Sequence, residues 1–118
     1  MNRAKRDSNR REMIRTLRPT GNKVNSLNFR PNETYEHKLL KFILYDRLQR
    51  KGYEIYTECT FLDGSRGDCI AIKNGLGYGF EILVSETEQE CTEKIKKYPN
   101  LFEWIMIKSK LDIDRLDL

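Results

Sequence analysis

The fold is decided by one stretch of sequence, Arg66-Gly-Asp-Cys-Ile-Ala-Ile-Lys-Asn-Gly-Leu-Gly-Tyr-Gly-Phe-Glu-Ile-Leu-Val84. Two short apolar runs stand on either side of Asn74-Gly75, a dipeptide typical of tight hairpin turns because glycine tolerates the positive φ that they require. The stretch therefore predicts two antiparallel strands joined by a turn. Each strand carries one acid, since Asp68 opens the first and Glu81 interrupts the second.

The register of this hairpin determines whether the two acids meet. We expect a loop over residues 74–77 with Lys73 paired to Tyr78, which puts Asp68 and Glu81 on one face of the sheet. The two then lie diagonally, about 7–8 Å apart between backbones. Two carboxylates at that spacing can bind one Mg²⁺ ion, because hard cations prefer oxygen ligands. The alternative is that both are strand-end charges in water.

Composition indicates a single globular domain. The chain has 118 residues, of which 34 % are charged and 38 % apolar, and it contains neither an apolar run long enough for a membrane span nor a signal-peptide core. We therefore expect a cytoplasmic protein with no membrane contact. Cys59, Cys69 and Cys91 lack the spacing of a metal site and are interpreted as reduced, partly buried thiols.

Charge is distributed unevenly along the chain. Residues 1–51 hold 14 Lys and Arg against 5 Asp and Glu, a balance of +9, whereas residues 52–118 hold 8 against 13, a balance of −5. The segment 1–31 is interpreted as a basic arm, either a DNA-binding element or a solvated tail, with a short helix possible around Met13, Ile14 and Leu17. The candidate nucleic-acid contacts are Arg10, Arg11, Arg15, Arg18 and Arg66.

The remaining pattern predicts helices and strands on both sides of the hairpin. A helix over 33–51 begins at Asn32 or Thr34 as N-cap and ends before Gly52. The sequence Ser85-Glu-Thr-Glu88 predicts a capping box and a helix that ends at Pro99. Strands are expected over 53–61 and 101–108, the latter parallel to the second hairpin strand. The tail 111–118 is compatible with either a short helix or a dimer-forming strand.

One acid stands out on the first long helix. Glu36 precedes Leu40 and Ile43 by four and seven residues, which places it at the edge of the expected buried stripe. A carboxylate at the edge of a buried stripe needs a partner that compensates its charge. The alternative is a first-turn Glu favoured by the helix dipole. We expect His37, on the neighbouring flank, to lie at the surface.

This order of elements, αβββαβ over residues 32–110, resembles the PD-(D/E)xK nuclease superfamily, especially its small archaeal Holliday-junction-resolvase-like and viral members. The resemblance implies an α/β fold with a restriction-endonuclease-like core, a mixed central sheet flanked by helices. It also implies a Mg²⁺- or Mn²⁺-dependent DNA endonuclease and a homodimer, for which the apolar tail is the candidate interface. Glu36 then matches the first-helix acid, and Asp68 and Glu81 match the metal ligands.

The sequence departs from the family pattern at two positions. Gly67 stands where the family often has proline, and Leu83 stands where it has its lysine, whose charge orients the attacking water and stabilises the phosphate. Lys73 faces the wrong side and Lys38 points away from Glu36. Lys94, on the second long helix, is therefore the best candidate for a substitute.

Two hypotheses of different class follow from these matches. In the first, the protein is a metal-dependent DNA endonuclease that uses Glu36, Asp68, Glu81 and Lys94. In the second, the fold persists as a DNA-binding or partner-binding module without chemistry. Leu83 favours the second, whereas the three clustered carboxylates favour the first, because like charges without a cation are costly to keep together.

Overall fold

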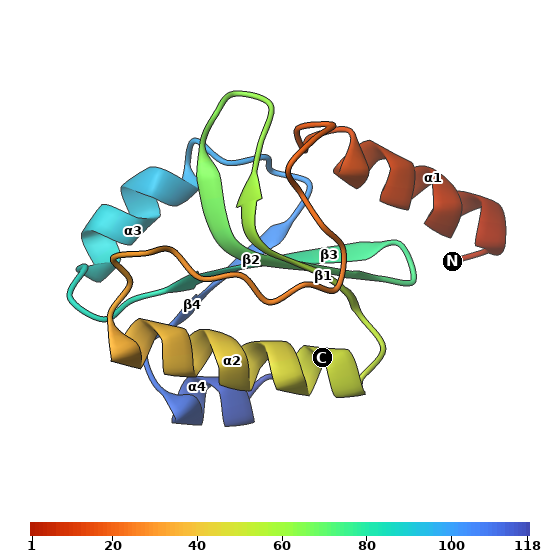
Figure 1. The fold of residues 1–118 in the computed structure, drawn as a ribbon. Helices are drawn as coiled ribbons and strands as arrows, with labels where there is room; N and C mark the ends of the chain where they lie inside the picture. Colours follow the sequence, from red (N-terminus) through yellow and green to blue (C-terminus); the bar gives the residue numbers. More distant parts are fainter.

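The computed structural model describes all 118 residues and has a four-stranded mixed sheet with helices on both faces (Figure 1). The strands lie in the order β1-β2-β3-β4; the first three are antiparallel and β4 runs parallel to β3. The expected α/β class is confirmed. The elements are α1 (Arg3–Ile14), α2 (Tyr35–Arg50), β1 (Glu54–Thr60), β2 (Arg66–Lys73), β3 (Leu76–Ile82), α3 (Glu88–Ile95), β4 (Glu103–Ile107) and α4 (Lys110–Asp114).

The hairpin between β2 and β3 is tighter than expected. Its turn consists of Asn74 and Gly75 alone, both with positive φ, and Lys73 pairs with Leu76. The expected Lys73–Tyr78 pairing is wrong by two residues, because a two-residue turn of this kind matches the twist of the strands. A shift of two residues keeps every side chain on its predicted face.

Two apolar cores lie on opposite faces of the sheet. The first lies beneath α2 and α4 and includes Leu44, Leu48 and Ile107. The second lies beneath α1 and includes Met13 and Phe61. Cys59, Cys69 and Cys91 are free and buried, as expected. No helix is long and apolar enough to cross a membrane.

The basic N-terminal segment packs on the sheet. Helix α1 begins after Asn2, whose side chain accepts a hydrogen bond from the Lys5 N–H at 2.8 Å. Met13 and Leu17 are buried in the second core. After α1 the chain follows the edge strand β1, where the Asn22 and Asn25 side chains accept hydrogen bonds from strand N–H groups. The segment therefore covers an edge that would otherwise be free to pair.

The helix starts differ in part from the predicted ones. Thr34 caps α2, as one of the two expected candidates. Helix α3 is capped by Thr87 with Glu90 completing the capping box, so the prediction that Ser85 is the cap is wrong. Residues 85–88 and residues 87–90 both fit the capping pattern. Because the helix uses the second of these tetrapeptides, Ser85 lies in the loop before the helix.

The C-terminal tail folds back onto its own chain. It forms α4, so the alternative of a tail strand is wrong. Ile113 is buried, and Leu116 and Leu118 pack against the first core. Most of the apolar surface of the tail is therefore used within the chain.

Candidate functional site

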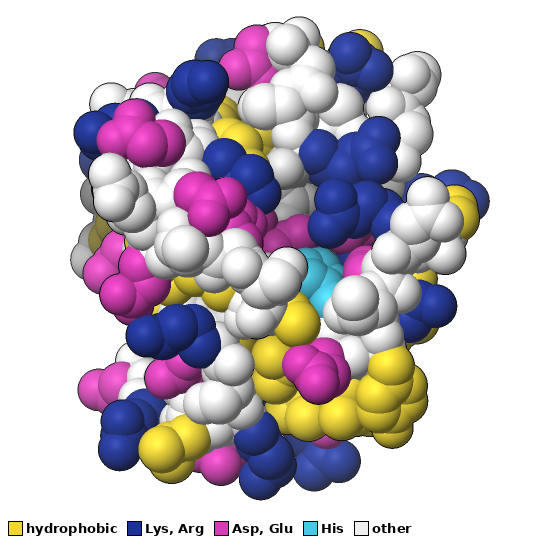
Figure 2. All heavy atoms as spheres, turned by 90° about the vertical axis from the view of Figure 1, so that its left-hand side faces the viewer, with side chains coloured by type: hydrophobic (Ala, Val, Ile, Leu, Met, Phe, Trp, Pro, Cys, Tyr) yellow, Lys and Arg dark blue, Asp and Glu magenta, His cyan; other side chains and the backbone are white.

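A polar cavity of about 500 Å³ opens where α2 begins, beside β2 and the end of β3. Fifteen residues line it and only two are hydrophobic. Figure 2 shows the cavity as a hollow with acids and the histidine at its floor and Lys and Arg side chains on both sides. The charged and titratable lining residues are Arg30, Glu33, His37, Glu58, Arg66, Asp68, Glu81, Glu86 and Lys94.

Asp68 and Glu81 form the centre of the site. The pairs Cys69–Phe80 and Ile70–Gly79 set the register, and one further step places Asp68 opposite Glu81. Both residues are buried, with 7 % and 3 % of their surface exposed. Asp68 Oδ2 accepts a hydrogen bond from the Ile82 N–H at 2.7 Å.

The pKa values of the two carboxyl groups shift in opposite directions. Burial and the adjacent Asp68 charge raise the pKa of Glu81 well above its usual value. Burial also acts to raise the pKa of Asp68, but hydrogen bonds from His37, Glu81 and the Ile82 N–H outweigh it and the pKa is lowered. Asp68 is therefore the ionised partner and Glu81 the protonated one at neutral pH.

His37 supports Asp68 from α2. Its Nε2 lies 3.4 Å from Asp68 Oδ2, and its Nδ1 lies 3.2 Å from Glu33 Oε2. Burial acts to lower the pKa of His37, but Asp68 and Glu33 together raise it above the usual value. The expectation that His37 lies at the surface is wrong, since only 8 % of it is exposed. The imidazole fixes the orientation of the aspartate.

Lys41 anchors the floor behind this histidine. It is fully buried, and its Nζ donates to Glu33 Oε2 at 2.7 Å, to Glu58 Oε1 at 2.7 Å and to the Asn28 carbonyl at 3.1 Å. Its ammonium does not line the cavity. The sequence does contain a signal for it, since Lys41 lies on the same helix face as Leu44 and Leu48.

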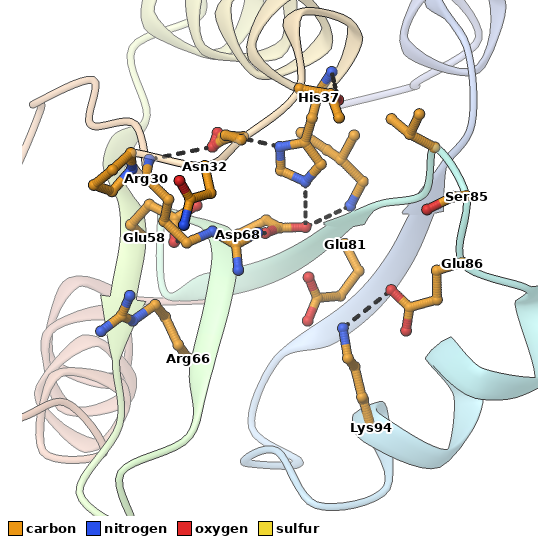
Figure 3. Close-up of a pocket in the computed structure, with 15 residues that line it drawn as sticks. Arg30, Asn32, His37, Glu58, Arg66, Asp68, Glu81, Ser85, Glu86 and Lys94 are labelled. Carbon is orange, nitrogen blue, oxygen red and sulfur yellow. Dashed lines mark hydrogen bonds and ion pairs between the residues drawn. The ribbon is translucent and has the colours of Figure 1, made fainter.

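Three cations border the cavity. Arg30 lies between Glu58 and Asp68, Arg66 is exposed at the start of β2, and Lys94 pairs with Glu86 at 3.0 Å (Figure 3). Burial acts to lower the pKa of Lys94, but Glu86 and the cavity acids raise it. Lys94 therefore stays protonated. Its role is that of a positive charge, and it does not act as a proton acceptor.

Four of the residues predicted for the site line this cavity: Asp68, Glu81, Lys94 and Arg66. Glu36 does not. It is exposed, so its expected place at the edge of the buried stripe is wrong. Leu40 and Ile43, which indicated that face, are only partly buried. Helix α2 instead turns His37 and Lys41 inward, and Glu33 just before the helix also has a buried side chain.

The predicted nucleic-acid contacts of the N-terminal arm lie outside the cavity. Arg10 forms a two-point ion pair with Glu54, at 2.6 and 2.8 Å. Arg11 is exposed, and Arg15 and Arg18 border a second groove of about 440 Å³ near Tyr56.

The donor set at the centre of the site suits a hard cation. No group of three or more His, Cys, Asp or Glu side chains has a ready-made metal-binding arrangement. Glu81 Oε1, however, is buried without a hydrogen-bond partner. A buried carboxylate oxygen of this kind is costly unless it is protonated or contacts a cation. Asp68 and Glu81 therefore fit Mg²⁺ or Mn²⁺ as two oxygen donors.

Comparison of the chain with models of protein families, with curated proteins and with solved structures gives no match.

Proposed function

We propose that this protein is a divalent-metal-dependent DNA endonuclease of the PD-(D/E)xK type, which hydrolyses phosphodiester bonds. The observation that carries the proposal is the buried Asp68–Glu81 pair, which lies on adjacent strands in a polar cavity bordered by cations. The order α2-β1-β2-β3-α3-β4 supports it, because it is the order of the αβββαβ core in that superfamily.

Asp68 and Glu81 would hold the metal ion, Mg²⁺ or Mn²⁺. Loss of the proton on Glu81 leaves two buried negative charges side by side, and a divalent cation compensates both. A bound ion of this kind supplies Lewis-acid stabilisation of the phosphate and lowers the pKa of its water. His37 keeps the Asp68 carboxylate turned into the cavity through the 3.4 Å contact.

The cations at the rim would bind the DNA phosphates. Arg66 is exposed at one side of the cavity and Lys94 lies at the other (Figure 3). Leu83, at the position of the family's lysine, is buried, and its N–H donates to the Ile107 carbonyl at 2.8 Å. Lys94 is thus the cation that takes over the electrostatic role of the missing lysine, stabilising charge that develops on the phosphate.

The experiment is a cleavage assay on labelled linear and four-way-junction DNA with Mg²⁺ or Mn²⁺. Asp68→Asn and Glu81→Gln should each lower the cleavage rate by roughly 10³-fold or more, since the cation contributes several kcal/mol to the transition state. Glu36→Gln is the matched control, because it removes an acid from the same helix turn as His37 but outside the cavity. Its rate should equal that of the wild type.

The wild-type result separates the two classes of function. Cleavage that is lost in Asp68→Asn and kept in Glu36→Gln supports the nuclease. DNA binding without cleavage in either metal would assign the protein to the second class, a recognition module, which the leucine at position 83 favours. Equal rates for the wild type and Asp68→Asn would remove the proposed site.

A further inference from the structure

A third acid lies in line with the central pair. On β1, Thr57 pairs with Cys69 and Cys59 pairs with Gly67, so Glu58 lies opposite Asp68. Asp68 in turn lies opposite Glu81 on β3. The three carboxylates therefore come from neighbouring positions on three adjacent strands, and all three line the same cavity.

The backbone of Glu58 is unusual and directs its side chain. Its φ is +51°, in the left-handed region that residues with a side chain rarely adopt. The conformation interrupts the alternation of β1, since Ile55 and Cys59 are buried in different cores although regular spacing would put them on one face. Such conformations persist where surrounding contacts enforce them, and they cluster at functional sites.

Both side-chain oxygens of Glu58 face cations. Oε1 accepts the hydrogen bond from Lys41, whereas Oε2 is buried without a hydrogen-bond partner and lies 3.3 Å from Arg30 Nε. Arg30 Nη2 lies 3.6 Å from Asp68 Oδ1. Both distances exceed those of ordinary charge-assisted hydrogen bonds. The guanidinium thus occupies the space between the two acids without bonding tightly to either.

The Arg30 side chain is held less firmly in this position than the Glu58 side chain is. Its side chain is 47 % exposed, and it belongs to the segment between α1 and α2, outside both cores. Glu58, in contrast, is held by buried Lys41. Departure of Arg30 would leave Glu58 and Asp68 facing each other with one uncompensated carboxylate oxygen each.

We propose that Glu58 is a third carboxylate of the cation site and that Arg30 is an internal counter-ion that the divalent cation displaces. The inference rests on the metal site of the proposed function and adds to it a residue that the sequence resemblance does not supply. Glu58 and Glu81, on the strands on either side of Asp68, each keep one buried oxygen without a hydrogen-bond partner.

The experiment is calorimetric titration of Mn²⁺ alone into the full chain, without DNA. Glu58→Gln should weaken Mn²⁺ binding by about tenfold or more, as loss of a metal-site group does. Arg30→Gln should strengthen it several-fold, because the competing cation is gone. Arg66→Gln is the matched control for the loss of one positive charge near the cavity. It removes an arginine that borders the cavity but does not lie between the acids. It should change the affinity less than Arg30→Gln does.

Folding of Glu58→Gln is checked by thermal unfolding, and Arg30→Gln, which alters an exposed side chain, tests the inference independently. Unchanged affinity in a folded Glu58→Gln protein, or unchanged or weaker binding in Arg30→Gln, would overturn the inference. A wild type that binds no Mn²⁺ would overturn it too, together with the metal requirement of the nuclease. Binding that follows the expected pattern, in a protein that cleaves no DNA, would support the cation site while removing the nuclease.

Discussion

Two buried charged clusters lie side by side in this protein and differ in how their charges are balanced. In the first, Lys41 is surrounded by Glu33, Glu58 and a backbone carbonyl. Although burial acts to raise the pKa of Glu33, the hydrogen bond and charge of Lys41 lower it below the usual value. In the second, Asp68 and Glu81 face each other and one oxygen of Glu81 has no partner.

The difference separates a structural role from a functional one. In the first cluster each carboxylate contacts cations of the chain itself, since His37 and Arg30 add to Lys41, and these contacts fix the start of α2 against β1. A cluster with a buried carboxyl group that no cation contacts, as at Glu81, destabilises the fold unless something else binds there.

Removal of the central cation of the first cluster should have the largest effect on stability. Lys41→Met leaves Glu33 and Glu58 buried without compensation, so we expect a loss of about 3–5 kcal/mol in the free energy of unfolding. Urea unfolding measures it. Lys97→Met, at an exposed lysine without an ion pair, is the control and should change stability by less than about 0.5 kcal/mol. A similar loss in both variants would contradict the structural role of Lys41.

Removal of the rim cations should affect DNA binding more than folding. The double variant Arg66→Gln/Lys94→Gln removes two proposed phosphate contacts, so the slope of log affinity against log salt should fall by about 2. Fluorescence anisotropy in metal-free buffer at several salt concentrations measures this slope. Arg50→Gln, at the far end of α2, should leave it unchanged. An unaltered slope in the double variant would mean that the DNA does not contact the rim of the cavity. The arginines of α1 would then be the next candidates for phosphate contacts.

The smallest effect is expected for the exposed Arg10–Glu54 pair. Its side chains are 45 % and 33 % exposed, so water and salt screen the attraction. Arg10→Gln should change the free energy of unfolding by about 1 kcal/mol or less, as measured in the same urea experiment as Lys41→Met. A loss as large as that for Lys41→Met would show that burial does not decide how much an ion pair contributes to the stability of this fold.

The sequence predicts the hairpin and the meeting of its two acids, because both depend on local patterns. Asn-Gly fixes a turn, and alternation keeps Asp68 and Glu81 on one face even when the register is wrong by two residues. The crossover through α3 to a parallel β4 follows from element order alone.

Most of the remaining site depends on long-range packing, and only Lys41 has a local signal, its place on the helix face of Leu44 and Leu48. The spacing to Leu40 and Ile43 favoured Glu36 as the inward acid, whereas α2 buries His37 and Lys41 and leaves Leu40 and Ile43 only partly buried. The sequence pattern predicts that Glu58 lies on the polar side of a half-exposed strand. Its left-handed backbone, which directs the side chain into the cavity, has no signature in the sequence.

We propose that Glu81 binds a cation and lowers the stability of the fold when no cation is bound. Since the pKa of Glu81 is raised in the folded protein, the folded state keeps a proton that the unfolded state releases. The pair therefore destabilises the fold increasingly as pH rises above the ordinary Glu value. Glu81→Gln removes this effect.

The most direct measurement is the free energy of unfolding of the wild type and Glu81→Gln at pH 8, without and with Mn²⁺. Without metal, Glu81→Gln should be the more stable protein by about 1–3 kcal/mol. With Mn²⁺ at about 100 times its Kd, the wild type should gain about 2.7 kcal/mol and the variant much less. A variant that is less stable without metal and responds to Mn²⁺ as the wild type does would contradict the account.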